Sequence, residues 1–341
     1  MQSYALQIFL KKQGHEVWLI KRVPEDITVT ITNRIKNFIK IILGRKIKEI
    51  THNMLAFEND YMQKTDIISN DGNFHLLDKY KFDACIAGSD QVWRFDYTQS
   101  RRKNYFLDFI TSNTVKKISF SASFGIDEWK LSEKDTAEIA ELIHKFDIVS
   151  IREKAGVDLC QKHLNCEATL LLDPAFLLTI NEYRRLYTGD EPENKGKILL
   201  YFLDHHKPAR KIINTVSQHL HKEVFSIGKE TINVWFKKEI YYPPISNWIK
   251  GFDDASFVIT DSFHGCVFSI IFKKPFIVLG NQERGMSRFT SLLDIFGFTN
   301  QLIYNKDINS FQIHNLDFTN VDNIINENFQ KSKEFVSILN S

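Results

Sequence analysis

Short apolar runs alternate with longer amphipathic stretches along most of the chain. Residues 82–87, 117–122 and 148–151 are apolar runs bounded by polar or turn-forming residues, and each predicts a buried strand. The stretches 132–145 and 153–163 carry apolar residues at helical spacing and predict the helices that follow two of these strands. Strands that alternate with helices in this way predict a parallel sheet built from βαβ units.

The same alternation returns in the second half of the chain, after a polar stretch at residues 187–197 that is rich in Gly, Pro, Asp and Glu. We therefore predict an α/β protein with two Rossmann-like domains, residues 1–178 and 179–341, that face each other across a cleft. In the second half, strands are expected at 197–203, 223–227, 257–260 and 275–279, and helices at 209–220, 246–252, 265–272 and 288–296.

The start of the chain departs from this pattern. Residues 1–13 predict an amphipathic helix that ends at Gly14, and residues 16–20 predict a strand, with helices expected in much of 31–66. A helix followed by a strand normally continues a unit whose first strand precedes the helix, so the first strand of the first sheet is expected to be missing here. We expect a form extended upstream by about 10 to 20 residues, enough for one strand and a turn, to be more stable and more active.

The bulk composition leaves this picture in place. The 341 residues suit two domains, and 43% hydrophobic with 25% charged residues is an ordinary globular balance. The formal net charge of +2 gives no reason to expect a nucleic-acid partner. The chain shows neither a signal-peptide pattern nor a run of about 20 apolar residues, so a cytoplasmic location is expected.

One segment raises the question of a membrane contact. Residues 35–50 mix apolar side chains with several Lys and Arg. A surface helix that packs its apolar stripe on the protein is the favoured interpretation. The alternative is a basic amphipathic helix that makes a peripheral contact with the inner face of the membrane.

Cysteine and cofactor patterns exclude several chemistries. The four cysteines are scattered without a Cys-x-x-Cys pair, so buried free thiols are expected, and His205-His206 has no evident third ligand, so no metal is expected. The Gly-x-Gly-x-x-Gly, Walker A and Gly-x-Ser-x-Gly motifs are all absent from the sequence, so NAD and ATP are not indicated. The cysteines are Cys85, Cys160, Cys166 and Cys266.

The strongest candidate site follows the predicted strand 257–260, where the sequence reads Asp261-Ser262-Phe263-His264-Gly265. Ser262 can cap the next helix, whose free amides form an anion site. His264 is then placed as a proton donor or acceptor near neutral pH. In the alternative interpretation these residues only cap and pack, but their clustering at one strand end favours function.

Three further segments also follow strands. Gly88-Ser89-Asp90-Gln91-Val92-Trp93 offers a tight turn with polar side chains, although Trp93 is as readily an aromatic plug. Arg152, in Ser150-Ile151-Arg152-Glu153, can bind a carboxylate or phosphate bidentately, and the alternative is an ion pair with Glu153 or another carboxylate. The loop at residues 281–289 adds Arg284 and Arg288, for which solubility alone is the alternative explanation.

These segments, in this order and together with Leu172-Asp173-Pro174, resemble the polysaccharide pyruvyl transferase family from Met1 to about Gln301. The resemblance implies a GT-B-like fold and transfer of a pyruvyl group from phosphoenolpyruvate, without a cofactor, to a sugar of a glycan or lipid-linked precursor as a ketal. It implies that His264 is the acid–base residue and that Arg152 and Arg288 hold the donor's anionic groups. The remaining substrate-binding candidates are Ser89, Asp90, Gln91, Asp261, Ser262 and Gly265.

Two departures keep other functions open. The family usually opens with a strand and an Asn-x-Gly loop, and it often has an Arg where this chain has Gln301. A glycosyltransferase that uses a nucleotide-sugar is one alternative, because the two-domain architecture serves both chemistries. A catalytically silent binding protein of a glycan-synthesis complex is the other.

Overall fold

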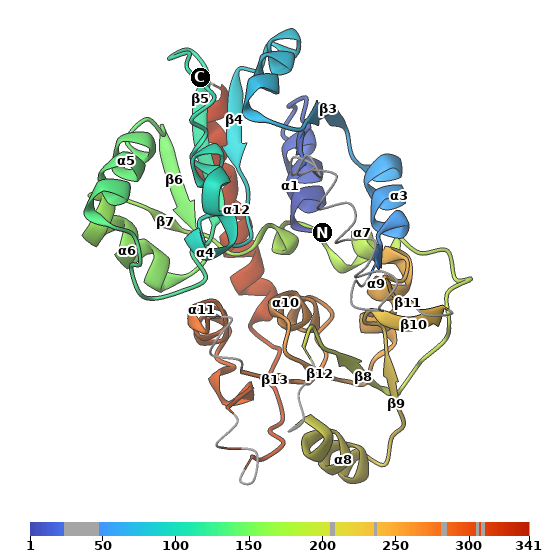
Figure 1. Cartoon of the computed structure of the whole chain (residues 1–341). Helices are drawn as coiled ribbons and strands as arrows, with labels where there is room; N and C mark the ends of the chain where they lie inside the picture. The colour runs from blue at the N-terminus through green and yellow to red at the C-terminus, as the bar shows by residue number, and fades with distance from the viewer. Residues whose placement is uncertain are drawn as a thin grey trace.

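The structure, a computed structural model, describes residues 1–23, 48–204, 209–234, 237–280, 285–304, 307 and 311–340. Its main framework is two parallel sheets, one in each half of the chain (Figure 1). The predicted fold class, an α/β chain with two Rossmann-like halves in a GT-B-like arrangement, is confirmed.

The first half is built on a four-stranded parallel sheet in the order β4-β5-β6-β7. Its helices begin where the sequence predicts them; Ser132, for example, caps α5 by accepting a hydrogen bond of 3.1 Å from the amide of Asp135. The elements are β4 (Ala84–Ala87), β5 (Lys116–Ala122), α5 (Glu133–Ile143), β6 (Ile148–Ile151), α6 (Lys154–Leu164) and β7 (Thr169–Leu170).

The second half holds a continuous five-stranded parallel sheet in the order β14-β13-β12-β8-β9. Its central strand β12 is buried along its whole length, as expected of a strand covered on both faces. The elements are β8 (Ile198–Tyr201), α8 (Ala209–Leu220), β9 (Val224–Ser226), α9 (Ile245–Asp254), β12 (Phe257–Thr260), α10 (Phe263–Ile271), β13 (Phe276–Leu279), α11 (Ser287–Phe296) and β14 (Leu302–Ile303).

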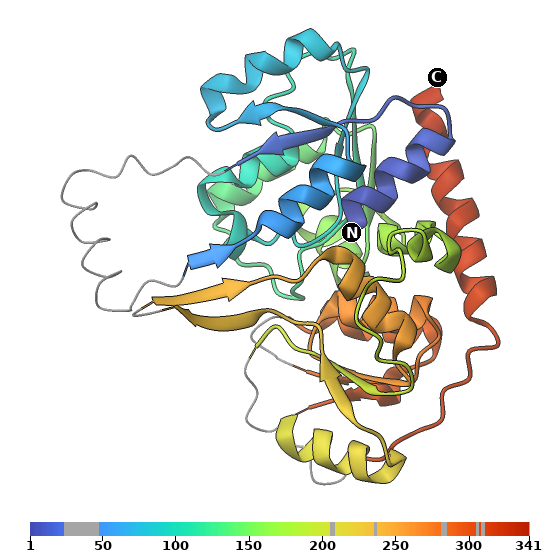
Figure 2. The same ribbon diagram turned by 90° about the vertical axis from the view of Figure 1, so that its right-hand side faces the viewer.

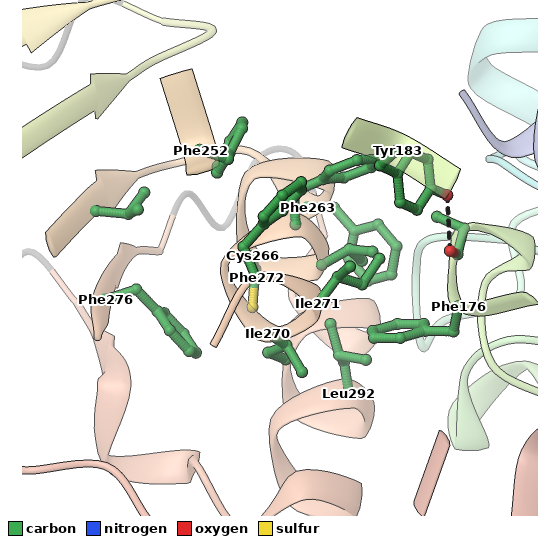
Figure 3. Packing of buried hydrophobic residues seen from close by; sticks show 14 of the residues in the cluster. Phe176, Tyr183, Phe252, Phe263, Cys266, Ile270, Ile271, Phe272, Phe276 and Leu292 are labelled. Atoms are coloured by element: carbon green, nitrogen blue, oxygen red, sulfur yellow. Dashed lines mark hydrogen bonds between the residues drawn. The ribbon is translucent and has the colours of Figure 1, made fainter. Parts of the chain in front are cut away.

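Phenylalanine fills the core that covers this second sheet. Phe252, Phe263, Phe272 and Phe276 are buried there with aliphatic side chains of α10 and α11 (Figure 3). Tyr183 joins the same core and donates a 2.7 Å hydrogen bond from its hydroxyl to the carbonyl of Ala175. The high Phe content therefore serves packing.

The beginning of the chain forms a separate two-stranded sheet, in which β1 (Leu19–Arg22) pairs in parallel with β3 (Lys64–Ile68). A cavity of about 510 Å³ lies between β1 and β4, beneath the first helix, α1 (Gln2–Lys12). Within the described residues, no strand lies between β1 and β4.

Two other segments differ from the sequence-based expectations. Residues 48–50 form β2 and residues 64–68 form β3, so the predicted helices there are limited to α3 (His52–Tyr61), while 24–47 lie outside the described residues. The strands β10 (Glu230–Val234) and β11 (Lys237–Tyr241) were not predicted. They form an antiparallel pair whose second strand also pairs with β2, so this small sheet connects the two halves.

The last long helix, α12 (Val321–Val336), leaves the second half and packs on the first (Figure 2). Its Asn328 accepts a 2.8 Å hydrogen bond from the amide of Leu172, and its Val336 packs against Phe9 and Phe120. Residues that the predicted division assigns to the second domain thus cover the first sheet. The boundary at residue 178 itself remains a prediction.

The remaining short elements connect these parts. They are η1 (Asp71–Tyr80), α4 (Phe95–Thr98), η2 (Gln99–Phe106), η3 (Pro174–Leu177), α7 (Ile180–Arg184), η5 (Thr299–Gln301) and η7 (Ser337–Asn340).

No helix in the described part of the chain is both long and apolar enough to cross a membrane. The candidate membrane-surface helix at 35–50 lies outside that part except for residues 48–50, which form β2.

Candidate active site

Arg152 lies at the centre of a buried charge cluster at the carboxyl end of β6. Its guanidinium is 2.7 Å from Asp173 and 3.0 Å from Asp90, and its Nε is 3.9 Å from Glu153. Burial alone would lower the pKa of Arg152, but these three carboxylates raise it above its ordinary value. The ion-pair alternative is therefore what the structure shows, and donor binding by Arg152 stays a prediction.

Asp173 is a site residue that the sequence analysis did not select. It follows Leu172 at the carboxyl end of β7, where its Oδ1 accepts a 3.0 Å hydrogen bond from the amide of Ala175 and its Oδ2 accepts one of 2.9 Å from the Ser89 hydroxyl. Burial raises the pKa of Asp173, but His264, Arg152 and the Ala175 amide outweigh burial and hold that pKa well below its usual range. The Asp-Pro pair at the end of a strand was the available signal, and it served only as part of the resemblance.

His264 occupies the first turn of α10, directly after β12. Ser262 caps this helix by accepting a 3.3 Å hydrogen bond from the amide of Gly265, as predicted. The His264 Nε2 lies 3.7 Å from Asp173 Oδ2, and 22% of its side chain is exposed. Unlike Arg152, His264 can therefore contact a substrate while its imidazolium form remains close to a carboxylate.

Two neighbours of His264 shape the turn through contacts within the protein. The carboxylate of Asp261 accepts hydrogen bonds of 2.7 and 3.0 Å from the amides of Leu203 and Asp204, in the loop after β8. A side chain at Gly265 would place its Cβ 2.2 Å from Thr260 Oγ1, so glycine is required for this close approach. Their predicted contact with substrate is untested, and the structure gives both a positioning role.

Arg288 projects from the first turn of α11 toward the same cluster. Its guanidinium carbon is 5.3 Å from the ring centroid of Phe263, and that of Arg152 is 4.4 Å from the same ring. Burial, followed by the charge of Arg152, lowers the pKa of Arg288 to about 10, which leaves it protonated at neutral pH. The structure thus brings Arg288 to Arg152 and His264, while Arg284 lies outside the described residues.

The turn after β4 contributes Ser89 and Asp90. Asp90 has a positive φ of 84°, a conformation in which Asp is tolerated better than most residues, and its side chain is 48% exposed. Burial by itself would raise the pKa of Asp90, but the charges of Arg152, His264 and Arg288 lower it to about 2. Gln2 of α1 donates to this carboxylate at 3.2 Å, which connects the start of the chain to the cluster.

The other predicted residues of this turn face elsewhere. Gln91 packs on Gly125, and its Oε1 accepts a 3.0 Å hydrogen bond from Arg94. Trp93 is fully buried and stacks on Phe106 with 4.6 Å between ring centroids, so it is a packing residue of the core. Gln91 is thus not brought to Arg152 and His264 by this structure.

Glu153 is a second residue whose position the sequence analysis missed. It is fully buried, and one of its oxygens accepts hydrogen bonds from Ser123 Oγ (3.0 Å), the Phe124 amide (2.7 Å) and the Gly125 amide (3.0 Å). Burial raises the pKa of Glu153 and exceeds the opposing effect of Arg152. The carboxylate therefore ties the loop after β5 to the start of α6, beside the charge cluster.

Metal and thiol chemistry find no support in the part of the chain that the structure describes. That part contains no cluster of three or more His, Cys, Asp or Glu residues that could hold a metal, and His205-His206 lies outside it. All four cysteines are buried free thiols, which the apolar runs around Cys85 and Cys266 predicted for those two. Burial raises the pKa of Cys85 to about 12, so this thiol stays protonated at neutral pH.

The fold and the site together define a class of α/β proteins in which a partly exposed histidine and two buried arginines meet at the carboxyl ends of parallel strands. The family model described as polysaccharide pyruvyl transferase matches residues 1–283 of the chain. This protein belongs to the polysaccharide pyruvyl transferase family, which is a family of transferases.

Solved structures resemble the chain at low sequence identity. A functionally uncharacterised protein of Klebsiella pneumoniae has 14% identity and a TM-score of 0.42, with 89% of this chain and 99% of that chain covered. A putative UDP-N-acetylglucosamine 2-epimerase of Listeria monocytogenes has 11% identity and a TM-score of 0.47, with 94% and 89% covered. The UDP-GlcNAc 2-epimerase of Neisseria meningitidis has 12% identity and a TM-score of 0.44, with 97% and 98% covered. No curated protein matches the chain significantly.

Proposed function

We propose that this protein transfers the pyruvyl group of phosphoenolpyruvate to two hydroxyls of a sugar in a glycan or its precursor, forming a cyclic ketal. The observation that carries the proposal is the partly exposed His264, 3.7 Å from the buried Asp173 and beside two arginines. An imidazole can both donate and accept a proton, which the transfer requires.

The reaction needs one acid–base group that acts more than once. Imidazolium of His264 donates a proton to the methylene carbon of phosphoenolpyruvate, and the neighbouring carbon becomes a cationic centre. A sugar hydroxyl adds to that carbon and gives up its proton. The C–O bond to phosphate then breaks with its electron pair on the phosphate, and a second hydroxyl adds to close the ketal and releases its proton.

The donor's anions are assigned to Arg288 and to the amides at the start of α10. Arg152 already neutralises Asp90 and Asp173 at 3.0 and 2.7 Å, so its role is to hold the carboxylates that face His264. Arg288 retains its charge at neutral pH, and its guanidinium carbon lies 5.3 Å from the ring centroid of Phe263, the first residue of α10. A helix N-terminus beside a guanidinium is a suitable site for a phosphate or carboxylate.

The test is release of inorganic phosphate from phosphoenolpyruvate in the presence of a panel of glycosides, with the His264→Ala variant alongside. We expect acceptor-dependent phosphate release by the wild-type protein and its loss in the variant. Release of a nucleotide from a nucleotide-sugar would instead support the glycosyltransferase alternative. Release of neither product, by a protein that melts cooperatively, would overturn the proposal and support a silent binding role.

A further inference from the structure

A pocket of about 430 Å³ has His264 in its wall. The end of β8 and the loop after β9 line it with Tyr201 and Lys229; the segment that leads into α9 adds Tyr242, and α9 itself adds Trp248. Gln2 and Met54 of the first half complete the wall, so the pocket lies between the two halves. Its position beyond the carboxyl ends of parallel strands is where α/β sheets bind ligands.

The lining chemistry contrasts with that of the charge cluster. Of the described residues that line the pocket, most are aromatic or aliphatic, and the basic side chains among them are Lys229 and His264. The charge cluster next to His264 instead holds the three carboxylates Asp90, Asp173 and Glu153 against two guanidiniums. His264 is the residue that belongs to both environments.

The aromatic wall is held rigidly. Trp248 is buried and meets Tyr201 edge to face, with 5.6 Å between ring centroids, and it packs on Phe268 at 4.5 Å. On the other side, Asn53 of α3 donates a 2.8 Å hydrogen bond to the backbone carbonyl of Tyr242. A contact from the first half thus fixes the backbone of the second half at the pocket, which lowers the entropy lost on binding.

We propose that this pocket is the acceptor subsite and that it takes a neutral pyranose ring, with two of the ring's hydroxyls directed at His264. The inference rests on the proposed function. A pyranose has an apolar face of C–H groups and a rim of hydroxyls, which suits rigid aromatic side chains with few polar groups. A nucleotide diphosphate would bring its phosphate charges to a wall whose basic side chains are Lys229 and His264 and whose other side chains are mostly apolar, so the neutral sugar is the better fit.

The position of His264 then separates the two substrates. The anionic donor binds on the side of Arg288, and the neutral acceptor binds on the side of Tyr201 and Tyr242. A ring in the aromatic pocket brings its hydroxyls to the imidazole, which lines that pocket. His264 is therefore able to exchange protons with donor carbon and acceptor oxygen without leaving its place on α10.

The experiment uses Tyr242→Ala as the pocket variant and Tyr61→Ala as the matched control, since Tyr61 is 42% exposed and lies outside the pocket. Phosphate release from phosphoenolpyruvate is measured with p-nitrophenyl hexosides as acceptors, and KM is determined separately for donor and acceptor. We expect Tyr242→Ala to raise the acceptor KM about tenfold, corresponding to about 1.4 kcal/mol, with the donor KM unchanged. Tyr61→Ala should leave both constants at the wild-type values.

A binding measurement separates failure of this inference from failure of the proposed function. Quenching of tryptophan fluorescence by the same hexosides needs no turnover, and the part of the quenching that is lost in Trp248→Phe reports on Trp248 among the five tryptophans of the chain. Absence of phosphate release with hexoside binding that Tyr242→Ala weakens would reject the proposed reaction and keep the sugar subsite. Unchanged acceptor KM in Tyr242→Ala, no quenching by any hexoside, or quenching by UDP or ADP in their place would overturn the subsite.

Discussion

The two halves of the molecule contribute to the candidate site in different ways. In the first half, Arg152, Asp90 and Asp173 lie at strand ends and neutralise one another inside the protein. In the second half, β12 delivers His264 to a partly exposed position at the start of α10, next to an aromatic pocket. The first half thus supplies a charged platform, and the second half supplies the group that can reach substrate.

The difference extends to the sheets. The second sheet is continuous over five strands, with its central strand fully buried. The first half is divided by a cavity of about 510 Å³ between β1 and β4, so its strands are held by side-chain packing and by the charge cluster as well as by the sheet. Substitutions in the platform should therefore affect stability, whereas substitutions of the reactive group should affect turnover alone.

The largest effect is expected from His264→Ala. Loss of the imidazole should lower turnover of phosphoenolpyruvate roughly 100-fold or more, because general acid–base catalysis contributes about that much. The melting temperature should stay close to that of the wild type, since the ring is partly exposed. His75→Ala, at an exposed histidine of η1, is the control. Near-normal turnover in a folded His264→Ala protein would remove this residue from the mechanism.

Arg152→Met tests the platform. The substitution leaves Asp173 and Glu153 buried without their cation, which should cost about 3–5 kcal/mol of unfolding free energy. Arg152→Lys keeps a charge but loses the planar guanidinium. Its unfolding free energy and its KM for phosphoenolpyruvate should therefore lie between those of Arg152→Met and those of the wild type. Urea titration and donor kinetics measure both properties. Equal stability of all three proteins would show that the cluster does not hold the first half together.

How much of this arrangement was predictable depends on how local its causes are. The strand at 148–151 and the helix at 209–220 agree with β6 and α8 residue for residue, because apolar periodicity reports local structure. Ser262 was recognised as a helix cap for the same reason. The pair β10–β11 was missed because it is a largely polar segment that is held by pairing with β2, which is distant in sequence.

The site itself was predictable in its residues more than in their roles. The partners of Arg152 are 62 and 21 residues away, at Asp90 and Asp173, and no local pattern reveals which carboxylate meets which guanidinium. Arg152 was therefore expected to bind the donor, whereas the structure shows it in ion pairs with Asp90 and Asp173. Asp173 was present in the motif but was not selected as a site residue. Its function depends on the long-range approach of Ser89, Arg152 and His264.

A pH titration sharpens the contrast between the halves by a smaller effect. The folded-state pKa of Asp90 is lowered to about 2, against about 3.9 in an unfolded chain, so its ion pair stabilises the protein fully above pH about 4. That stability is lost as the pH falls through the folded pKa. In Asp90→Asn, unfolding free energy should be lower at pH 6 and should fall less steeply between pH 4 and 2.5. Parallel curves for variant and wild type would contradict the ion pair.

The smallest expected effect concerns the contact between the halves. Ser291 of α11 accepts a 3.0 Å hydrogen bond from the amide of Lys154, so a side chain of the second half caps the first turn of α6 in the first half. Ser291→Ala leaves this amide without that partner, and loss of a helix cap costs typically about 1 kcal/mol. Ser132→Ala is the matched control, because Ser132 caps α5 entirely within the first half.

Both variants should lose similar stability in urea titrations. Only Ser291→Ala should also raise KM for phosphoenolpyruvate, since Arg288 lies on the same helix one turn earlier, and a one-ångström displacement of a binding group is felt in kinetics. If both variants show wild-type KM, the contact between α6 and α11 stabilises the fold but does not position the donor site.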